Sequence, residues 1–181
     1  APPKEFWRIE TNPLMVATGD KSIFFDGPRG FCLYRTIGPY LVVFADPVVR
    51  KPADREVFLT ALMAFCAEVD RRPVWYQISP EWIPVLHDRG YEFFKLGEEA
   101  HVHLDRVTLD GRAGAMPRQY LRRAERDGLR FRVLPPEETA ARMAELKGIS
   151  DGWLVSRGLV ERQFSIGFFD EDYLRRFPCA V

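Results

Sequence analysis

The sequence lacks a net charge of either sign, and it lacks long hydrophobic runs. Lys and Arg together number 26, as do Asp and Glu, so any electrostatic argument must rest on local patches. No segment approaches the ~18–20 uninterrupted apolar residues that a membrane-spanning helix needs. The first residues also lack the charged-then-apolar order of a signal peptide. We therefore expect these 181 residues to be soluble, as a part trimmed from a longer membrane protein would also be.

Cysteine is scarce and is not arranged in pairs. Cys32, Cys66 and Cys179 are odd in number and show no Cys-x-x-Cys spacing. Cys32 and Cys66 lie in apolar runs, where a small buried thiol is the ordinary interpretation. The pattern indicates a reducing compartment.

The common catalytic motifs are missing as well. The sequence contains no Gly-x-Ser-x-Gly, His-Glu-x-x-His, Walker or Gly-x-Gly-x-x-Gly pattern. The nearest approach to the pyrophosphate turn of acetyl-CoA enzymes, [Gln/Arg]-x-x-Gly-x-[Gly/Ala], is residues 111–115, but its first position is Gly111 rather than Gln or Arg. Coenzyme A binding is therefore not supported, and we expect no cofactor.

Two polar pairs could suggest a site but do not make one. His101 and His103 flank one residue of a predicted strand and so share a face, as two metal ligands would, but no third ligand is near in sequence. A polar outer strand face is the favoured interpretation, and we predict no metal. Glu98 and Glu99 are adjacent, so on a strand they face opposite sides and do not form an acid/base dyad.

The residues that are present are typical of a globular protein. Hydrophobic residues make up 46% and aromatic residues 13% of the chain, which is ample for a packed core. A length of 181 residues exceeds the common single-domain size of ~100–150 residues without reaching two full domains. One domain and part of a second would fit this length.

The first part of the chain predicts a mixed α/β domain over residues 1–107. Turn residues separate three β-type runs, which predicts an antiparallel meander. Apolar residues at three- and four-residue steps then predict a helix that covers the sheet with Phe58, Leu62, Phe65, Cys66 and Val69. The resulting β-β-β-α-β-α-β-β order is that of the acetyltransferase-type GNAT sheet with flanking helices. The predicted elements are strands 22–25, 31–37 and 40–44, helix 53–70, strand 74–78, helix 80–88, and strands 91–95 and 100–104.

The second part, residues 108–181, predicts the start of another unit. A single long helix is expected to bury Met143, Leu146 and Trp153, with a possible kink at Gly148. These elements cannot form an independent sheet domain, because a strand with open edges leaves apolar surface in water. We expect an incomplete, truncated second GNAT-like unit, the alternative being that the first domain takes up these elements. The predicted elements are helix 117–127, strand 131–134, helix 136–157, a helical turn at 170–174 and a strand start at 178–181.

Arginine is concentrated between residues 112 and 132. This stretch holds seven Arg against one Glu and one Asp. Arg118, Arg122 and Arg126 follow i, i+4, i+8 spacing, so a helix presents three guanidinium groups on one stripe that suits phosphate oxygens. The stripe could hold RNA or an anionic headgroup. The alternative is a solvated helix face partly paired with neighbouring acids.

Five sequence blocks, taken in order, resemble the C-terminal region of the aminoacyl-phosphatidylglycerol synthases. This family is also called the phosphatidylglycerol lysyltransferase or multiple peptide resistance factor family. The resemblance covers nearly the whole chain from about Thr18. The blocks are residues 18–21 (Thr-Gly-Asp-Lys), 44–48 (Phe-Ala-Asp-Pro-Val), 95–100 (Lys-Leu-Gly-Glu-Glu-Ala), 149–154 (Ile-Ser-Asp-Gly-Trp-Leu) and 161–167 (Glu-Arg-Gln-Phe-Ser-Ile-Gly).

The resemblance implies a fold, a reaction and a location. It implies two tandem GNAT-like domains on the cytoplasmic face of the bacterial inner membrane, attached to the membrane-spanning domain of a parent protein. The implied reaction moves an amino acid, lysine or alanine, from aminoacyl-tRNA to phosphatidylglycerol, which lowers the negative charge of the membrane. No coenzyme A is used. The implied partners are aminoacyl-tRNA and phosphatidylglycerol at the membrane surface.

Two departures from the family pattern qualify this expectation. Residues 45–47 are Ala-Asp-Pro where the family pattern has Gly-Asp-Pro, a change that affects a turn. The chain also ends before the Asp-Leu-Met-Arg block and the Lys-rich segment to which the resemblance assigns the main catalytic contacts. We therefore expect the main catalytic residues beyond Val181 and expect this fragment to be inactive alone.

A few site candidates remain within the chain. Asp151 and Glu161 are the catalytic candidates, against the alternative that they cap helices or form ion pairs. Trp153 is a substrate-binding candidate, together with Arg118, Arg122 and Arg126 for phosphate. Two other functions stay open: a non-catalytic module that binds anionic lipid or RNA, and an acetyl-CoA-dependent acyltransferase.

Overall fold

Three antiparallel strands open the computed structural model, which describes residues 18–98, 100, 102–165 and 167–181. They are β1 (Ser22–Phe25), β2 (Gly30–Ile37) and β3 (Tyr40–Val49). β1 pairs with β2 and β2 with β3, both antiparallel. Gly27 and Gly38 have φ of 57° and 54°, a backbone conformation that glycine adopts at little cost in the connecting turns. The predicted meander is confirmed, with a third strand longer than expected.

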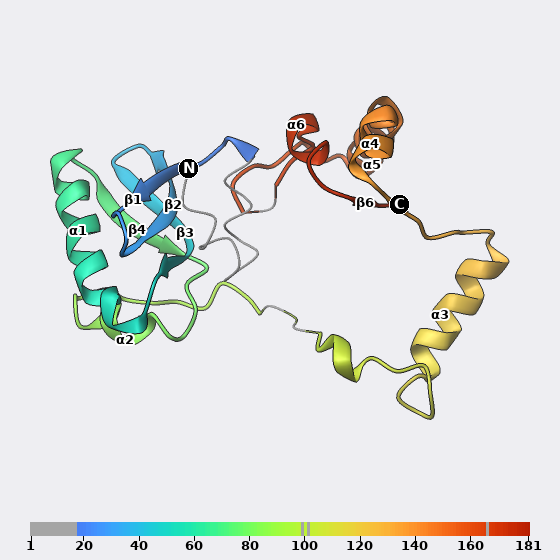
Figure 1. Cartoon of the computed structure of the whole chain (residues 1–181), viewed down its shortest axis with the longest axis horizontal. Helices are drawn as coiled ribbons and strands as arrows, with labels where there is room; N and C mark the ends of the chain where they lie inside the picture. The colour runs from blue at the N-terminus through green and yellow to red at the C-terminus, as the bar shows by residue number, and fades with distance from the viewer. Residues whose placement is uncertain (1–17, 99, 101, 166) are drawn as a thin grey trace.

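A fourth strand joins the meander in parallel. β4 (Arg72–Tyr76) lies beside β3, with Tyr40 opposite Arg72 and Phe44 opposite Tyr76. The sheet order is therefore β1-β2-β3-β4. A parallel neighbour needs a crossover connection, and helix α1 (Arg55–Glu68) supplies it. Figure 1 shows α1 lying against this sheet.

Helix α1 buries the face that the apolar spacing predicts. Phe58, Leu62 and Cys66 are buried and pack with Cys32, Leu41 and Val43 of the sheet. Phe65 is partly buried against the same cluster, whereas Val69, beyond the last helical residue, is exposed. The buried positions of Cys32 and Cys66 confirm that both are packed thiols.

A short helix completes this core. α2 (Ile83–His87) follows β4, and Leu86 packs with Trp82 and with Leu59 of α1. Gly90, with φ of 83°, ends this segment as a left-handed residue. The predicted helix at 80–88 is therefore present in shortened form.

The two strands predicted at 91–95 and 100–104 are not present in the described residues. Residues 91–98 have no regular structure, and a 3-10 turn occupies Leu104–Arg106. Phe94 is 81% exposed. A β-type run becomes a strand only when a neighbour pairs with its backbone, and the described chain offers none here. Glu99 and His101, on which the carboxylate and metal considerations partly rested, lie outside the described residues.

The remaining elements lie apart from the first sheet. α3 (Ala115–Arg126) stands alone in Figure 1, well separated from the other helices. β5 (Val133–Leu134) and β6 (Cys179–Ala180) form a separate antiparallel pair. The helices between them are α4 (Pro136–Ala141), α5 (Met143–Arg157) and α6 (Glu171–Leu174).

The single helix predicted over 136–157 is in fact two helices. The break lies at Arg142, with φ of −104°, where α4 ends and α5 begins. α5 runs through Gly148, and the possible kink there remains a prediction. No glycine or proline marks position 142, so residue type does not signal the break.

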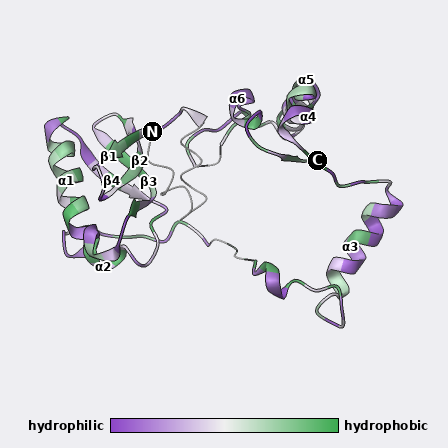
Figure 2. Cartoon of the chain, viewed as in Figure 1, coloured by the Kyte–Doolittle hydropathy of each residue, from purple (hydrophilic) through white to green (hydrophobic). Residues whose placement is uncertain are grey.

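A distant segment returns to the first sheet on the face away from α1. Phe164 packs against a buried cluster that includes Phe31, Leu33, Phe44 and Val48. Hydrophobic residues are frequent in the four-stranded sheet and in α1, whereas α3 is largely hydrophilic (Figure 2). The fold is thus a mixed α/β arrangement with a four-stranded sheet and flanking helices, as expected. The boundary predicted near residue 107 remains a prediction.

Candidate functional site

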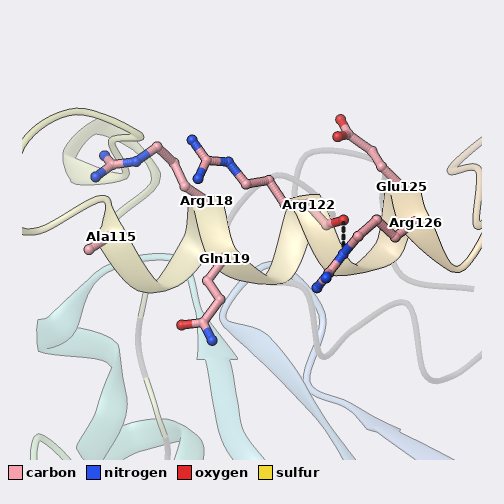
Figure 3. Close-up of a pocket in the computed structure, with 6 residues that line it drawn as sticks. All are labelled: Ala115, Arg118, Gln119, Arg122, Glu125 and Arg126. Atoms are coloured by element: carbon pink, nitrogen blue, oxygen red, sulfur yellow. Dashed lines mark hydrogen bonds between the residues drawn. The ribbon is translucent and has the colours of Figure 1, made fainter.

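Helix α3 presents the arginine stripe as its spacing predicts. Arg118, Arg122 and Arg126 lie along one side of the helix, beside a surface hollow (Figure 3). All the residues that line the hollow belong to α3, so it has one wall and is open to solvent. Such a surface suits an extended anion rather than an enclosed small molecule. The lining residues are Ala115, Arg118, Gln119, Arg122, Glu125 and Arg126.

The three guanidinium groups differ in the hydrogen bonds that they form. Arg118 donates a hydrogen bond to the Leu109 carbonyl, and Arg126 Nε donates to the Arg122 carbonyl at 3.3 Å. Within the described part of the chain, no acid pairs with any of the three, and Asp127 lies 3.7 Å from Arg123 instead. The pairing of the stripe with neighbouring acids is therefore not seen. Arg122 in particular is exposed and can offer its full set of donors to a ligand.

Gly114, directly before α3, has a steric role. A Cβ atom placed on Gly114 would lie 2.2 Å from the Leu109 carbonyl carbon, a distance that no side chain tolerates. The turn before α3 is therefore closed on itself by backbone packing. This contact accounts for the glycine without any pyrophosphate ligand.

Asp151 on α5 forms an ion pair with a lysine one turn earlier. Lys147 Nζ lies 2.7 Å and 2.8 Å from the two carboxylate oxygens of Asp151. The hydrogen bond to Asp151, together with the charges of Asp151, Glu161 and Glu171, raises the pKa of Lys147 against a smaller lowering by burial. The ammonium also sits 5.7 Å from the centre of the Phe169 ring. The ion-pairing interpretation of Asp151 is thus the one that the geometry matches.

Glu161 belongs to the same surroundings. Its Oε1 accepts a hydrogen bond from the Phe169 amide at 3.3 Å, and its charge acts on Lys147. Lys147 is therefore paired with Asp151 and is also affected by the charge of Glu161, which lies ten positions after Asp151 in the chain. We call Lys147, Asp151, Glu161 and Phe169 the carboxylate cluster.

Trp153 was expected on a buried face of α5, and that expectation is wrong. Met143 is buried and Leu146 half-buried, but Trp153 is 53% exposed. The three positions share one side of the helix, yet residues 151–157 are exposed apart from the half-buried Leu154. The exposed indole is free to contact a ligand, which a core tryptophan could not do.

The arginine stripe and the carboxylate cluster are not brought together. Figure 1 shows α3 far from α5 and α6. The candidate residues therefore form two separate surfaces, one basic and one mixed. Across the described residues, no three His, Cys, Asp or Glu side chains gather as metal ligands.

Sequence reasoning missed a buried ion pair at the start of the described chain. Lys21 Nζ lies 2.6 Å from Asp20 Oδ1, and the two side chains are 0% and 5% exposed. Asp20 also accepts hydrogen bonds from the Thr18 hydroxyl and from the Phe164 amide, both at 2.7 Å. Burial raises the pKa of the Asp20 carboxyl, but the hydrogen bonds from Lys21, Thr18 and Phe164 and the Lys21 charge bring it below its ordinary value.

No local signal could have found this pair. Adjacent opposite charges before a strand ordinarily lie in water. Their burial depends on Phe164, which is 144 residues away in sequence from Asp20. The only sequence signal at both Asp20 and Phe164 was the resemblance to the family, because residues 18–21 and 161–167 are two of its five blocks.

The sequence of this chain matches a known protein family over most of its length. The sequence profile described as "Phosphatidylglycerol lysyltransferase, C-terminal" matches residues 11–181. The chain belongs to this family. Curated relatives named phosphatidylglycerol lysyltransferase include those of Bacillus subtilis (strain 168), 41% identical over 90% of this chain, and Staphylococcus haemolyticus, 32% identical over 92%.

Solved structures in the family share the fold. The C-terminal domain of a putative lysylphosphatidylglycerol synthetase from Agrobacterium fabrum matches 95% of this chain with a TM-score of 0.86 and 35% identity. The structure of L-PGS from Bacillus licheniformis matches 98% of this chain with a TM-score of 0.86 and 34% identity. The matches cover 54% and 57% of those two chains.

The family members are much longer than this chain. The matches cover 19% and 20% of the two curated relatives. Every helix in the described residues is too short or too polar to cross a bilayer. This chain therefore spans about a fifth of the length of the curated relatives that it matches.

Proposed function

We propose that this chain is part of an enzyme that transfers an amino acid from aminoacyl-tRNA to phosphatidylglycerol. The observation that carries the proposal is the family match over residues 11–181, supported by curated relatives named phosphatidylglycerol lysyltransferase. The amino acid is lysine or alanine. The site of action is the cytoplasmic face of the bacterial inner membrane, where a membrane-spanning domain of the parent protein would hold this region.

The proposed reaction is an ester exchange. A phosphatidylglycerol hydroxyl attacks the ester carbonyl that joins the amino acid to the tRNA ribose. A new ester bond to the lipid forms, the bond to the ribose oxygen breaks, and the hydroxyl proton passes to that departing oxygen. Such a reaction needs positioned substrates, a route for the proton and donors for the developing oxyanion.

The described residues suit parts of this task. The exposed Arg122, flanked by Arg118 and Arg126, suits phosphate groups of the tRNA or the lipid. The exposed ring of Trp153 can pack on a flat or aliphatic part of a substrate. Asp151 and Glu161 are the candidates for moving the proton, because Asp151 pairs with Lys147 and the charge of Glu161 acts on the same lysine.

A transfer assay tests the proposal in the complete parent protein. Vesicles containing phosphatidylglycerol are mixed with the protein and with lysyl-tRNA or alanyl-tRNA, and the lipid is analysed for an added amino acid. Aminoacylated phosphatidylglycerol is the expected product. Absence of product with every charged tRNA would overturn the proposal.

A second candidate is a non-catalytic module that binds anionic lipid or RNA through α3. The observation that favours it is the exposed stripe, whose three guanidinium groups pair with no described acid. In this case the 181-residue chain alone binds tRNA or phosphatidylglycerol vesicles. Binding weakens with added salt and on Arg122→Glu, whereas the matched change Arg157→Glu at the end of α5 leaves it unaltered.

A further inference from the structure

Residues 163–165, which we call the docking segment, contact two strands of the first sheet and the residue Asp20 that precedes it. The Gln163 side chain accepts a hydrogen bond from Arg35 of β2 at 3.0 Å. The central amide of the segment donates to Asp20, two residues before β1, at 2.7 Å. The hydroxyl of its last residue shares a hydrogen bond with Tyr76 of β4 at 3.2 Å. The segment therefore bridges strands across the face opposite α1.

The ion pair and the docking segment depend on each other. The Lys21 ammonium lies 5.2 Å from the centre of the Phe44 ring and 5.7 Å from that of Phe164. Phe164 thus forms one wall of the space that keeps water from Lys21. A buried charge is tolerated only while it is paired and hydrogen-bonded. If the docking segment left, Asp20 would lose one donor and both charges would return to water.

The backbone of the docking segment is held in a costly conformation. Phe164 has φ of 73°, in the left-handed region that bulky residues rarely adopt. Two aromatic contacts oppose this cost, since the Phe164 ring centre lies 5.3 Å from that of Phe44 and 5.6 Å from that of Tyr76. We therefore expect the segment to be either docked or released, because a partly docked segment would keep the backbone strain without the aromatic contacts that offset it.

We propose that the Asp20–Lys21 ion pair is a latch that holds the docking segment on the first sheet. Glu161 lies two residues before the segment and accepts a hydrogen bond from Phe169, which lies beyond it. The latch therefore sets where the carboxylate cluster sits relative to the sheet. Asp20 and Lys21 act as positioning residues, and their importance for amino-acid transfer rests on the proposed function.

Hydrogen exchange measured by mass spectrometry on the 181-residue chain tests the latch without any substrate. Asp20→Asn keeps an oxygen that can accept from the Phe164 amide but leaves Lys21 charged and unpaired. Lys21→Met leaves the carboxylate without its counter-ion. In each variant we expect peptides containing the docking segment to exchange on the order of tenfold faster or more, because removing one member of a buried pair leaves an uncompensated charge.

The double variant separates a latch from two unrelated side-chain contributions. Asp20→Asn with Lys21→Met removes both charges, and methionine can still pack between the rings. Exchange of the docking segment should then return toward that of the unchanged protein, whereas independent effects would add. Asp26→Asn is the matched control, because it breaks the Asp26–Arg29 ion pair of the β1–β2 turn and should leave the docking segment unaffected.

Three outcomes would overturn the latch. Unchanged exchange of the docking segment in both single variants is one, and a double variant as fast as the sum of the two is another. The third is an equal rise in peptides of β2 and β3, which would mean general loss of the fold. A failed transfer assay leaves these results untouched, so the latch and the proposed function can fail separately.

Discussion

Residues 18–90 and residues 91–181 of this chain differ in how far they bury their large apolar side chains. The first region buries Phe31, Leu41, Phe58 and Trp82, among others, in three packed clusters. The second region buries Leu134 and Met143 but leaves many large apolar side chains in water. These exposed residues include Phe94, Leu104, Tyr120, Phe131, Trp153 and Val155.

The difference shows where stability resides. Burial of apolar surface is the main favourable contribution to folding, so the first region has its own source of stability. The second region relies on local helix hydrogen bonds, on the β5–β6 pair and on its contact with the first sheet through Phe164. The sharpest tests of the comparison apply the same change to both regions.

Thiol reactivity should give the largest contrast. Cys32 and Cys66 are buried in the first region, whereas Cys179 in the second is partly exposed. Burial also raises the pKa of the Cys32 and Cys66 thiols, which removes the reactive thiolate. We expect alkylation of Cys179 to be on the order of a thousandfold faster, since the buried thiols react only in the rare unfolded state. Peptide mapping after timed alkylation measures this.

Full reactivity of all three thiols in denaturant is the control for that experiment. Rapid labelling of Cys32 in the native protein would contradict the assignment of a packed core to residues 18–90.

Truncation of a phenylalanine should destabilise the first region strongly and the second hardly at all. Phe58→Ala removes a fully buried ring, and we expect it to cost about 3–5 kcal/mol of unfolding free energy. Phe131→Ala removes a ring that is 77% exposed and should change stability by less than about 0.5 kcal/mol. Urea titration followed by circular dichroism measures both changes. Equal losses of stability would contradict the difference in burial between the two regions.

Lowering the pH should weaken the contact between the docking segment and the first region, because this contact includes the Asp20 carboxylate. The pKa of Asp20 is lower in the folded protein than its ordinary value of 3.8. Its contribution to stability is therefore present above that value and is lost as the pH falls through the folded pKa. We expect the stability difference between the unchanged protein and Asp20→Asn, measured by urea titration, to shrink below about pH 4. A difference that stays constant down to pH 2 would contradict the role of the charge.

The smallest effect is expected for the ion pair on α5. The Lys147 and Asp151 side chains are about half exposed, so Asp151→Asn should lower stability by less than about 1 kcal/mol. The same substitution separates pairing from catalysis in the parent protein. If Asp151 moves the proton, transfer activity falls at least about tenfold while the urea midpoint hardly moves. Unchanged activity would leave Asp151 with its ion pair alone.

Local patterns were sufficient for much of the first region. Turn residues such as Gly27 and Gly38 predicted the meander, and the spacing of Phe58, Leu62 and Cys66 predicted the buried face of α1. The stripe of Arg118, Arg122 and Arg126 on α3 also followed from spacing. These features depend on the period of one strand or helix, which the order of residues contains directly.

Local patterns failed where an element needs a distant partner. Residues 91–95 were predicted as a strand but have no neighbour to pair with among the described residues. Trp153 has the spacing of a core residue but is 53% exposed. The effect of the Glu161 charge on Lys147 depends on the path of the chain after α5. None of these outcomes can be predicted from a short stretch of sequence.

The sequence by itself therefore determined the family, the helices and strands with strong periodicity, and the basic face of α3. Only the tertiary structure decided that the Asp20–Lys21 pair is buried and that the docking segment at Phe164 covers it. The physical reason is that burial is a property of two surfaces meeting. A charged pair before a strand lies in water until a segment 144 residues away excludes that water.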